Sequence, residues 1–144
     1  MQESAMILTD PQLHELFKRA RTIAVVGMSP NEARPSHYVA QYMREHGYTI
    51  FPVNPLHDEI AGIRCYPDLA SVPQPIDIVN VFRRAEYTPT IAREAVAIGA
   101  KCLWLQLGIV NAQAASIAHA VGMGVVMDAC IKVEHARLLE PDKN

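Results

Sequence analysis

The sequence predicts an α/β fold, in which a doubly wound parallel sheet of about five strands has helices on both faces. Three observations lead to this prediction. Short runs are apolar on both faces, amphipathic segments separate most of them, and 144 residues are too few for a closed eight-stranded barrel. Because crossovers between parallel strands are right-handed, a single Rossmann-like sheet is the natural solution.

The chain length is typical of one domain, so residues 1–144 are expected to form a single unit with a core over about 22–138. The first predicted element is a short helix over about 10–20. Asp10 is expected to be its N-cap, and Pro11 its first helical residue.

The predicted strands are apolar runs that end in turn residues, and they cover residues 22–27, 48–53, 76–82, 101–107 and 125–127. Ser36 is expected to cap the helix after the first strand, and Gly47 to end it. One helix therefore connects the first two strands.

The connection after the second strand has a different composition. Three prolines within 56–75 predict a broken crossover with one short helix around 68–72. Helical spacing then predicts a helix that ends before Gly99, another that Asn111 caps, and a last helix over 130–139.

The composition excludes several classes of protein. Thirteen Lys and Arg against fifteen Asp and Glu leave a net charge of −2, without the basic footprint of a nucleic-acid or membrane-surface protein. No apolar run reaches the length of a membrane span, and the N-terminus lacks the pattern of a signal peptide. Three widely spaced cysteines disfavour a disulfide framework or a zinc site. We expect a cytoplasmic protein.

Residues suited to ligand binding follow the predicted strands, where open α/β sheets bind their ligands. They are Gly27-Met28-Ser29-Pro30, Pro52-Val53-Asn54-Pro55, Phe82-Arg83-Arg84 and Gln106-Leu107-Gly108. A nicotinamide dinucleotide is disfavoured, because no second glycine occurs before Gly47 and Asn54 stands where a ribose-binding acid is needed. The sequence also has no G-K-[ST] phosphate loop.

The first of these loops, 28–35, remains suited to an anion. It contains Arg34 and leads into a helix whose free N–H groups favour a phosphate. Arg83 and Arg84 follow another strand and could hold a second phosphate. The alternative is that all three arginines are solvated surface charges.

Six short motifs extend this hypothesis. They are G-M-S at 27–29 with R-P-S-H at 34–37, H-G-Y at 46–48, P-V-N-P at 52–55, V-F-R at 81–83, W-L-Q-L-G at 104–108 and D-A-C-I-K-V-E-H at 128–135. With these motifs in this order, residues 22–138 resemble the family of small stand-alone coenzyme A-binding domains. That family is similar to the coenzyme A-binding N-terminal domain of the succinyl-coenzyme A synthetase alpha subunit.

The resemblance implies a Rossmann-type fold that holds coenzyme A (CoA), or an acyl-CoA, across the strand ends. It implies that the loop under the diphosphate is Gly27, Met28 and Ser29, and that the residues where this loop meets its helix are Arg34, Ser36 and His37. The adenosine would be flanked by Asn54 and Pro55, and the nucleotide bordered by Phe82 and Arg83. The pantetheine would follow Gln106 and Leu107.

The synthetase's later domain, with its phosphorylated histidine, has no counterpart in this sequence. The expected function is therefore binding of CoA or an acyl-CoA without catalysis, and no catalytic or metal-binding residue is assigned. Two alternatives stay open, a subunit of a multi-chain acyl-CoA ligase or transferase and a generic nucleotide-binding regulator. Neither a protein partner nor an oligomeric state is selected.

Two further groups have competing interpretations. Cys130, at the start of the last helix, is either a thiol that faces the thiol of CoA or a small buried residue, and Glu134 one turn later would oppose its ionisation. The run His57-Asp58-Glu59 resembles a metal cluster but is expected to be a solvated loop. Cys65 and Cys102 are expected to be packing residues.

Overall fold

A computed structural model describes residues 8–139. Its helices are α2 (Asp10–Arg19), α3 (Pro35–Glu45), α4 (Thr88–Ala97), α5 (Ala112–His119) and α6 (Ile131–Leu139). Its strands are β1 (Thr22–Val26), β2 (Thr49–Val53), β3 (Glu59–Ile60), β4 (Ile63–Arg64), β5 (Ile78–Val81), β6 (Cys102–Leu105) and β7 (Gly124–Val126). Two short 3₁₀ turns, Leu69–Ser71 and Ala85–Tyr87, complete the described elements.

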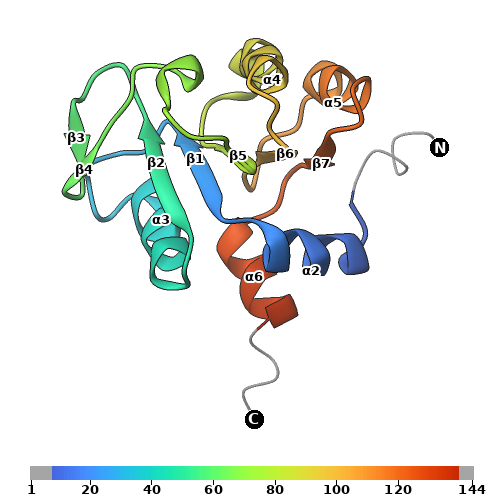
Figure 1. Ribbon diagram of the computed structural model, residues 1–144, viewed down its shortest axis with the longest axis horizontal. Helices are drawn as coiled ribbons and strands as arrows, with labels where there is room; N and C mark the ends of the chain where they lie inside the picture. The colour runs from blue at the N-terminus through green and yellow to red at the C-terminus, as the bar shows by residue number, and fades with distance from the viewer. Residues whose placement is uncertain (1–7, 140–144) are drawn as a thin grey trace.

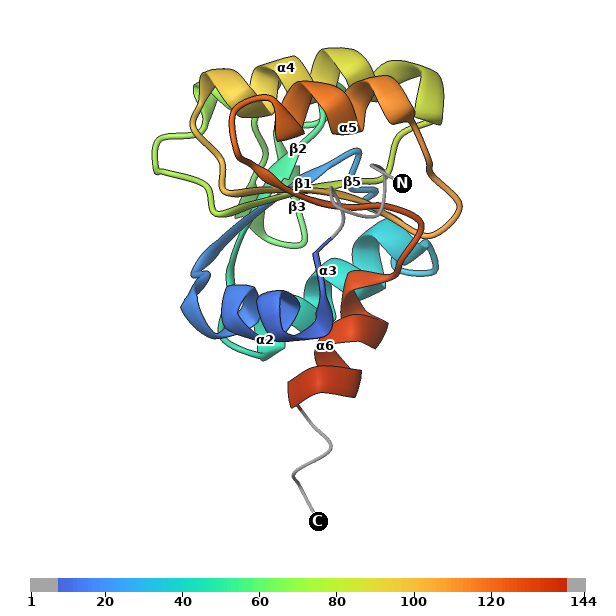
Figure 2. The ribbon, with the colours of Figure 1, turned by 90° about the vertical axis from the view of Figure 1, so that its right-hand side faces the viewer.

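Five of the strands form one parallel sheet in the order β2-β1-β5-β6-β7, which confirms the predicted fold class. Helices α4 and α5 cover one face, and α2, α3 and α6 cover the other (Figures 1 and 2). The chain leaves β1 toward β2 and then crosses back to β5 on the other side of β1. The strand order therefore reverses between β1 and β5, and such a point opens a crevice at the carboxyl ends of both strands.

The two faces of the sheet have separate cores, because successive side chains of a strand point to opposite faces. In β1, Ala24 and Val26 pack into the core beneath α4 and α5. Ile23 and Val25 belong to the core that α2, α3 and α6 cover. All five residues of β1 are buried, which explains why the strand reads as a continuous apolar run.

Two predicted N-caps are wrong. The N-cap of α2 is Thr9, whose hydroxyl accepts from the Gln12 N–H while the Gln12 side chain accepts from the Thr9 N–H, so Asp10 is already helical. Helix α3 begins at Pro35 and has no side-chain cap. Ser36 does not cap this helix, because its Oγ accepts a hydrogen bond from Ser29 N–H. The predicted Asn111 cap of α5 is confirmed, with Oδ1 2.8 Å from Ala114 N.

The crossover after β2 contains an antiparallel pair, β3 and β4, that the sequence did not predict. Strands of two residues are too short to show an alternating pattern, and Ala61 at the turn adopts a positive φ of 56°. The predicted short helix is the 3₁₀ turn Leu69–Ser71, which Asp68 caps. Within residues 8–139, no helix is both long enough and apolar enough to span a membrane.

Candidate functional site

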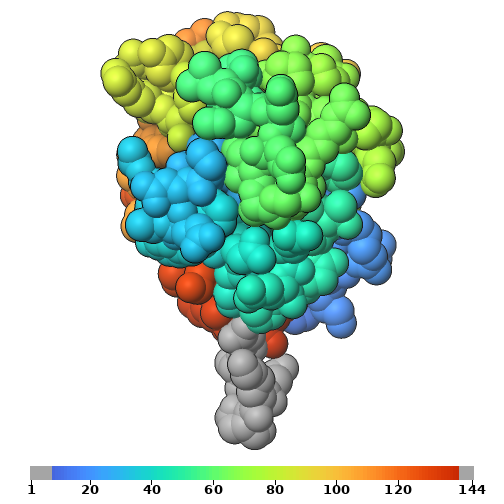
Figure 3. All heavy atoms as spheres, turned by 90° about the vertical axis from the view of Figure 1, so that its left-hand side faces the viewer, coloured from blue at the N-terminus to red at the C-terminus, as the bar shows by residue number. Residues whose placement is uncertain are grey.

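The loop after β1 is held by side chains from two other segments. Ser29 N–H donates to Ser36 Oγ at 3.0 Å, and the Asn54 amide donates to the Met28 carbonyl at 3.0 Å. His37, on α3, lies with its Nδ1 2.8 Å from the Ser29 carbonyl, so Nδ1 carries the proton. Figure 3 shows the loop packed beside the segment that follows β2. These bonds give the loop one defined shape beside the crevice.

Three of the residues that the resemblance singled out therefore bond or pack within the protein. Met28 is 1% exposed and His37 is 7% exposed. The side chain of Asn54 uses both polar atoms on backbone, since its Oδ1 also accepts from Leu56 N–H at 2.9 Å. These three side chains shape the loop, and none of them lines the three pockets described next.

Three pockets follow one another along the carboxyl ends of the strands. The loop pocket, about 300 Å³, is lined by Gly27, Ser29, Arg34, Pro35, Ser36 and Phe82. The α3–α6 pocket, about 570 Å³, is lined by Pro35, Tyr38, Val39, Phe82, Arg83, Arg84, Gln106, Leu107, Ile109, Cys130, Lys132 and Val133. The α4 pocket, about 270 Å³, is lined by Val26, Val53, Pro55, Pro67, Asp68, Arg83, Tyr87, Thr90, Ile91 and Glu94.

These pockets share walls. Pro35 and Phe82 line both the loop pocket and the α3–α6 pocket, and Arg83 lines both the α3–α6 pocket and the α4 pocket. They therefore form one continuous surface that crosses the sheet edge at the reversal of strand order. A surface of this length suits an extended ligand better than a compact one.

The charges along this surface are unevenly distributed. Within the described part of the chain, Arg34, Arg83 and Arg84 form no ion pair, and no carboxylate lines the loop pocket or the α3–α6 pocket. The Arg83 guanidinium lies 4.7 Å from the centroid of the Tyr87 ring, which holds it at the rim. Because α3 begins in the loop pocket without a side-chain cap, its N-terminus adds positive potential there.

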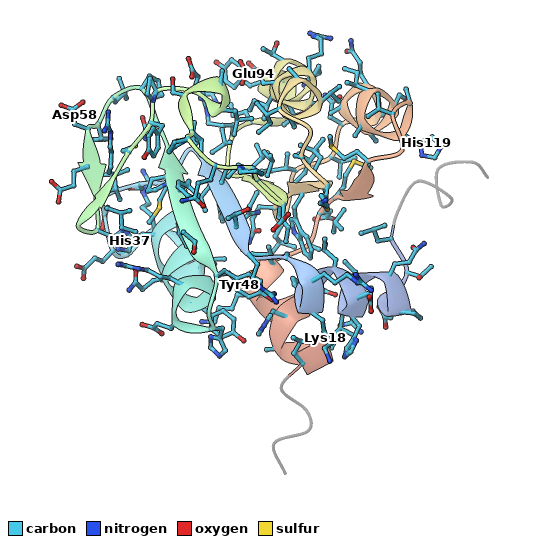
Figure 4. All side chains as sticks on the ribbon, viewed as in Figure 1. Lys18, His37, Tyr48, Asp58, Glu94 and His119 are labelled. Atoms are coloured by element: carbon cyan, nitrogen blue, oxygen red, sulfur yellow. The ribbon has the colours of Figure 1, made fainter. Side chains whose placement is uncertain are left out.

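The far end of the surface is acidic. Asp68 and Glu94 line the α4 pocket, and burial, followed by the charge of Asp68, raises the pKa of the Glu94 carboxyl. Figure 4 shows Glu94 on α4 and His37 on α3, on opposite sides of the sheet. The sequence analysis did not identify either acid as a site residue, because it interpreted each one as part of a predicted helix.

Gln106 is the most constrained polar side chain of the α3–α6 pocket, at 5% exposure. Its Oε1 accepts from Asn80 Nδ2 at 3.2 Å and from Ile131 N–H at 3.3 Å. These two donors determine which end of the amide is oxygen. Its nitrogen makes no hydrogen bond to any described residue, so an acceptor from a ligand would satisfy it.

Most residues that the resemblance singled out line the three pockets. The remaining nine residues from the resemblance, which line the pockets, are Gly27, Ser29, Arg34, Ser36, Pro55, Phe82, Arg83, Gln106 and Leu107. The α3–α6 pocket adds Tyr38 and Lys132, which the sequence analysis missed. Tyr38 could have been found from its position one helical turn after Arg34, on the same helix face.

A larger cavity, about 650 Å³, lies at the amino ends of the strands, among Arg21, Asp77, Lys101 and Gly124. None of the residues predicted for the site lines it, and ligands of open α/β sheets bind at the opposite end. The described residues include no group of three His, Cys, Asp or Glu side chains that could hold a metal ion. The site is therefore assigned to the carboxyl ends.

Comparison with known proteins identifies relatives of this chain. The protein YneT of Bacillus subtilis is 44% identical over 125 residues, which are 87% of this chain and 93% of YneT. A hypothetical protein from Pyrococcus horikoshii has a TM-score of 0.89 at 37% identity, over 92% of this chain and 93% of that one. Acetate–CoA ligase (ADP-forming) II of Archaeoglobus fulgidus is 30% identical over 95 residues, 65% of this chain but 14% of the ligase. The model of the CoA-binding domain family matches residues 21–136, and the chain belongs to that family.

Proposed function

We propose that the protein binds CoA, or an acyl-CoA, along the three connected pockets and does not by itself catalyse a reaction of this ligand. The continuity of the pockets carries this proposal, because CoA is an extended molecule with a nucleotide at one end and a thiol at the other. Membership of the CoA-binding domain family supports the same ligand class.

Each part of CoA has a pocket of suitable chemistry. The diphosphate is assigned to the loop pocket, where Arg34 and the N-terminus of α3 supply positive potential. The adenosine is assigned to the α4 pocket, in which carboxylates can accept hydrogen bonds from an exocyclic amine. The pantetheine is assigned to the α3–α6 pocket, where Leu107 and Ile109 offer apolar contact and Gln106 a free donor.

Binding without catalysis is supported by the side chains that line these pockets. No described lining residue is a histidine, and the nearby His37 bonds a carbonyl rather than a hydroxyl or a thiol. A nucleophile with a hydrogen-bonded histidine base, the usual arrangement for acyl transfer, is therefore not part of the described pockets.

Calorimetric titration tests the ligand class. CoA is expected to bind much more tightly than NAD, because Asn54 replaces the ribose-binding acid and is bonded to the loop backbone. Dephospho-CoA separates the contribution of the 3′-phosphate. Equal or tighter binding of NAD would contradict the proposal.

The likeness to acetate–CoA ligase favours a second candidate, a subunit of a multi-chain acyl-CoA ligase. That candidate predicts acyl transfer only when a second chain supplies the remaining catalytic residues. Incubation of the purified chain with acetyl-CoA, ADP and phosphate tests the first proposal, since ATP formed by this chain alone would contradict binding without catalysis. ATP formed only after a second chain is added would favour the subunit.

A further inference from the structure

Cys130 is held at a defined position in the α3–α6 pocket. It stands between β7 and α6 and is half-buried. The residues on either side of it are bonded to the end of the sheet, since Trp104 Nε1 donates to the Ala129 carbonyl at 2.9 Å and Ile131 N–H donates to Gln106 Oε1 at 3.3 Å. The backbone that carries the thiol is therefore tied to a rigid element.

Gln106 independently indicates that this pocket takes a ligand with hydrogen-bond acceptors. The side chain is nine-tenths buried, its oxygen is used by Ile131 and Asn80, and its nitrogen has no partner among residues 8–139. No buried side-chain nitrogen or oxygen among the described residues lacks a partner, so the Gln106 nitrogen is accessible from the pocket and can donate to a ligand there. The amide carbonyls of a pantetheine arm are acceptors of the required kind.

The charges around Cys130 are compatible with an attacking sulfur. Lys132 lines the same pocket, with its ammonium 5.7 Å from the Tyr38 ring centroid and 5.4 Å from that of Tyr42. The sequence suggested that Glu134 would oppose ionisation of the thiol. In the structure Glu134 is paired with Arg137, which also binds Asp10 on α2, so its charge is compensated outside the pocket.

We propose that Cys130 takes part in thiol–disulfide exchange with a CoA disulfide that is bound in this pocket. The Cys130 thiolate attacks one sulfur of a CoA disulfide, the sulfur–sulfur bond of that disulfide breaks, and one CoA leaves as a thiolate that takes up a proton from water. A new disulfide joins Cys130 to the other CoA. The oxidising equivalent comes from the CoA disulfide, and a small thiol reverses the step. This inference rests on the proposed binding of CoA.

The other two cysteines serve as internal controls. Cys102 lies in β6 at 0% exposure, and burial raises the pKa of its thiol to about 12. Cys65 is 5% exposed, and burial likewise raises the pKa of its thiol. Neither lines the α3–α6 pocket.

The experiment compares CoA disulfide with glutathione disulfide at equal concentration, followed by peptide mapping without reductant. CoA disulfide is expected to modify Cys130 at least about tenfold faster than glutathione disulfide does, because binding raises the local concentration of the reacting sulfur. Desulfo-CoA, which occupies the site without a thiol, should slow the reaction. The variant Cys130→Ser should form no adduct, and its thermal melt checks that it is folded.

The outcomes separate this inference from the proposed function. If calorimetry shows that CoA binds but Cys130 reacts no faster with CoA disulfide than with glutathione disulfide, the exchange is refuted and CoA binding stands. Modification spread over Cys65 and Cys102 also refutes it. If CoA does not bind at all, both proposals fail.

Discussion

Gly27 and Arg83 come into contact where the strand order of the sheet reverses. A Cβ placed on Gly27 would lie 2.9 Å from Cδ of Arg83 and 2.9 Å from the Phe82 carbonyl oxygen. Gly27 also adopts a φ of +89°, which L side chains rarely take. Glycine is therefore needed here both for the turn after β1 and for the approach of the chain that follows β5.

Gly27→Ala is expected to lower the free energy of unfolding by about 1–3 kcal/mol from backbone strain, with a further loss from the contact to Phe82. Gly47→Ala is the matched control, since its φ of +99° is similar but nothing lies within 4 Å of the added Cβ. Urea denaturation measures both. Equal losses in the two variants would show that the close approach at Gly27 has no energetic consequence.

Arg34→Ala and Arg83→Ala are each expected to weaken CoA binding by about 1.5–3 kcal/mol, the usual value of a hydrogen bond to a charged group. Both arginines line the pockets, and neither forms an ion pair with a carboxylate among the described residues. Arg44→Ala, exposed in the last turn of α3, is the control for a general loss of charge. Unchanged affinity in both pocket variants would identify these arginines as surface charges.

Gln106→Glu tests the free amide donor. The substituted carboxylate retains an oxygen for Ile131 N–H and Asn80 Nδ2, but it replaces the nitrogen by an acceptor. CoA binding should weaken about tenfold or more, because the group that donates to the ligand becomes an acceptor. Calorimetry at neutral pH measures the loss, and tighter binding by the variant would argue against a ligand acceptor at this position.

Tyr48→Phe is expected to reduce stability by about 1–3 kcal/mol at neutral pH, because the buried Tyr48 hydroxyl donates to the Phe17 carbonyl. Burial raises the pKa of Tyr48 to about 12, from an ordinary value of 10.0. As pH rises through this range, the unfolded chain loses the Tyr48 proton first, so the parent protein loses stability. The difference between parent and variant should therefore shrink above pH 10, and a constant difference in urea midpoints would contradict this assignment.

Glu94→Gln should raise the melting temperature modestly at pH 7. The pKa of Glu94 is raised by burial and by the charge of Asp68, so its ionised form is less favourable in the folded state than in the unfolded chain. The advantage of the variant should fade below the ordinary pKa of 4.5, where both states of the parent hold the proton. Calorimetric melts from pH 3 to 7 measure the difference in melting temperature between the variant and the parent. A difference that does not depend on pH would contradict a raised pKa of Glu94.

The sequence determined the sheet and most of its helices, because burial on both faces and helical periodicity are local patterns. Every residue of β1 and β6 is buried, and Asn111 caps α5 through a bond only three residues away. The strand ends, and with them the segments that line the pockets, could also be read from these patterns.

The tertiary structure alone decided what the polar side chains at those ends do. Ser36, His37 and Asn54 have polar side chains of the types that bind ligands. In the structure, however, each forms a hydrogen bond with the backbone of the loop after β1. The orientation of the Gln106 amide, and hence its free donor, depends on Ile131, 25 residues away in the chain. A polar side chain selects its partner among groups that folding brings within about 3 Å, and no local periodicity encodes which group that is.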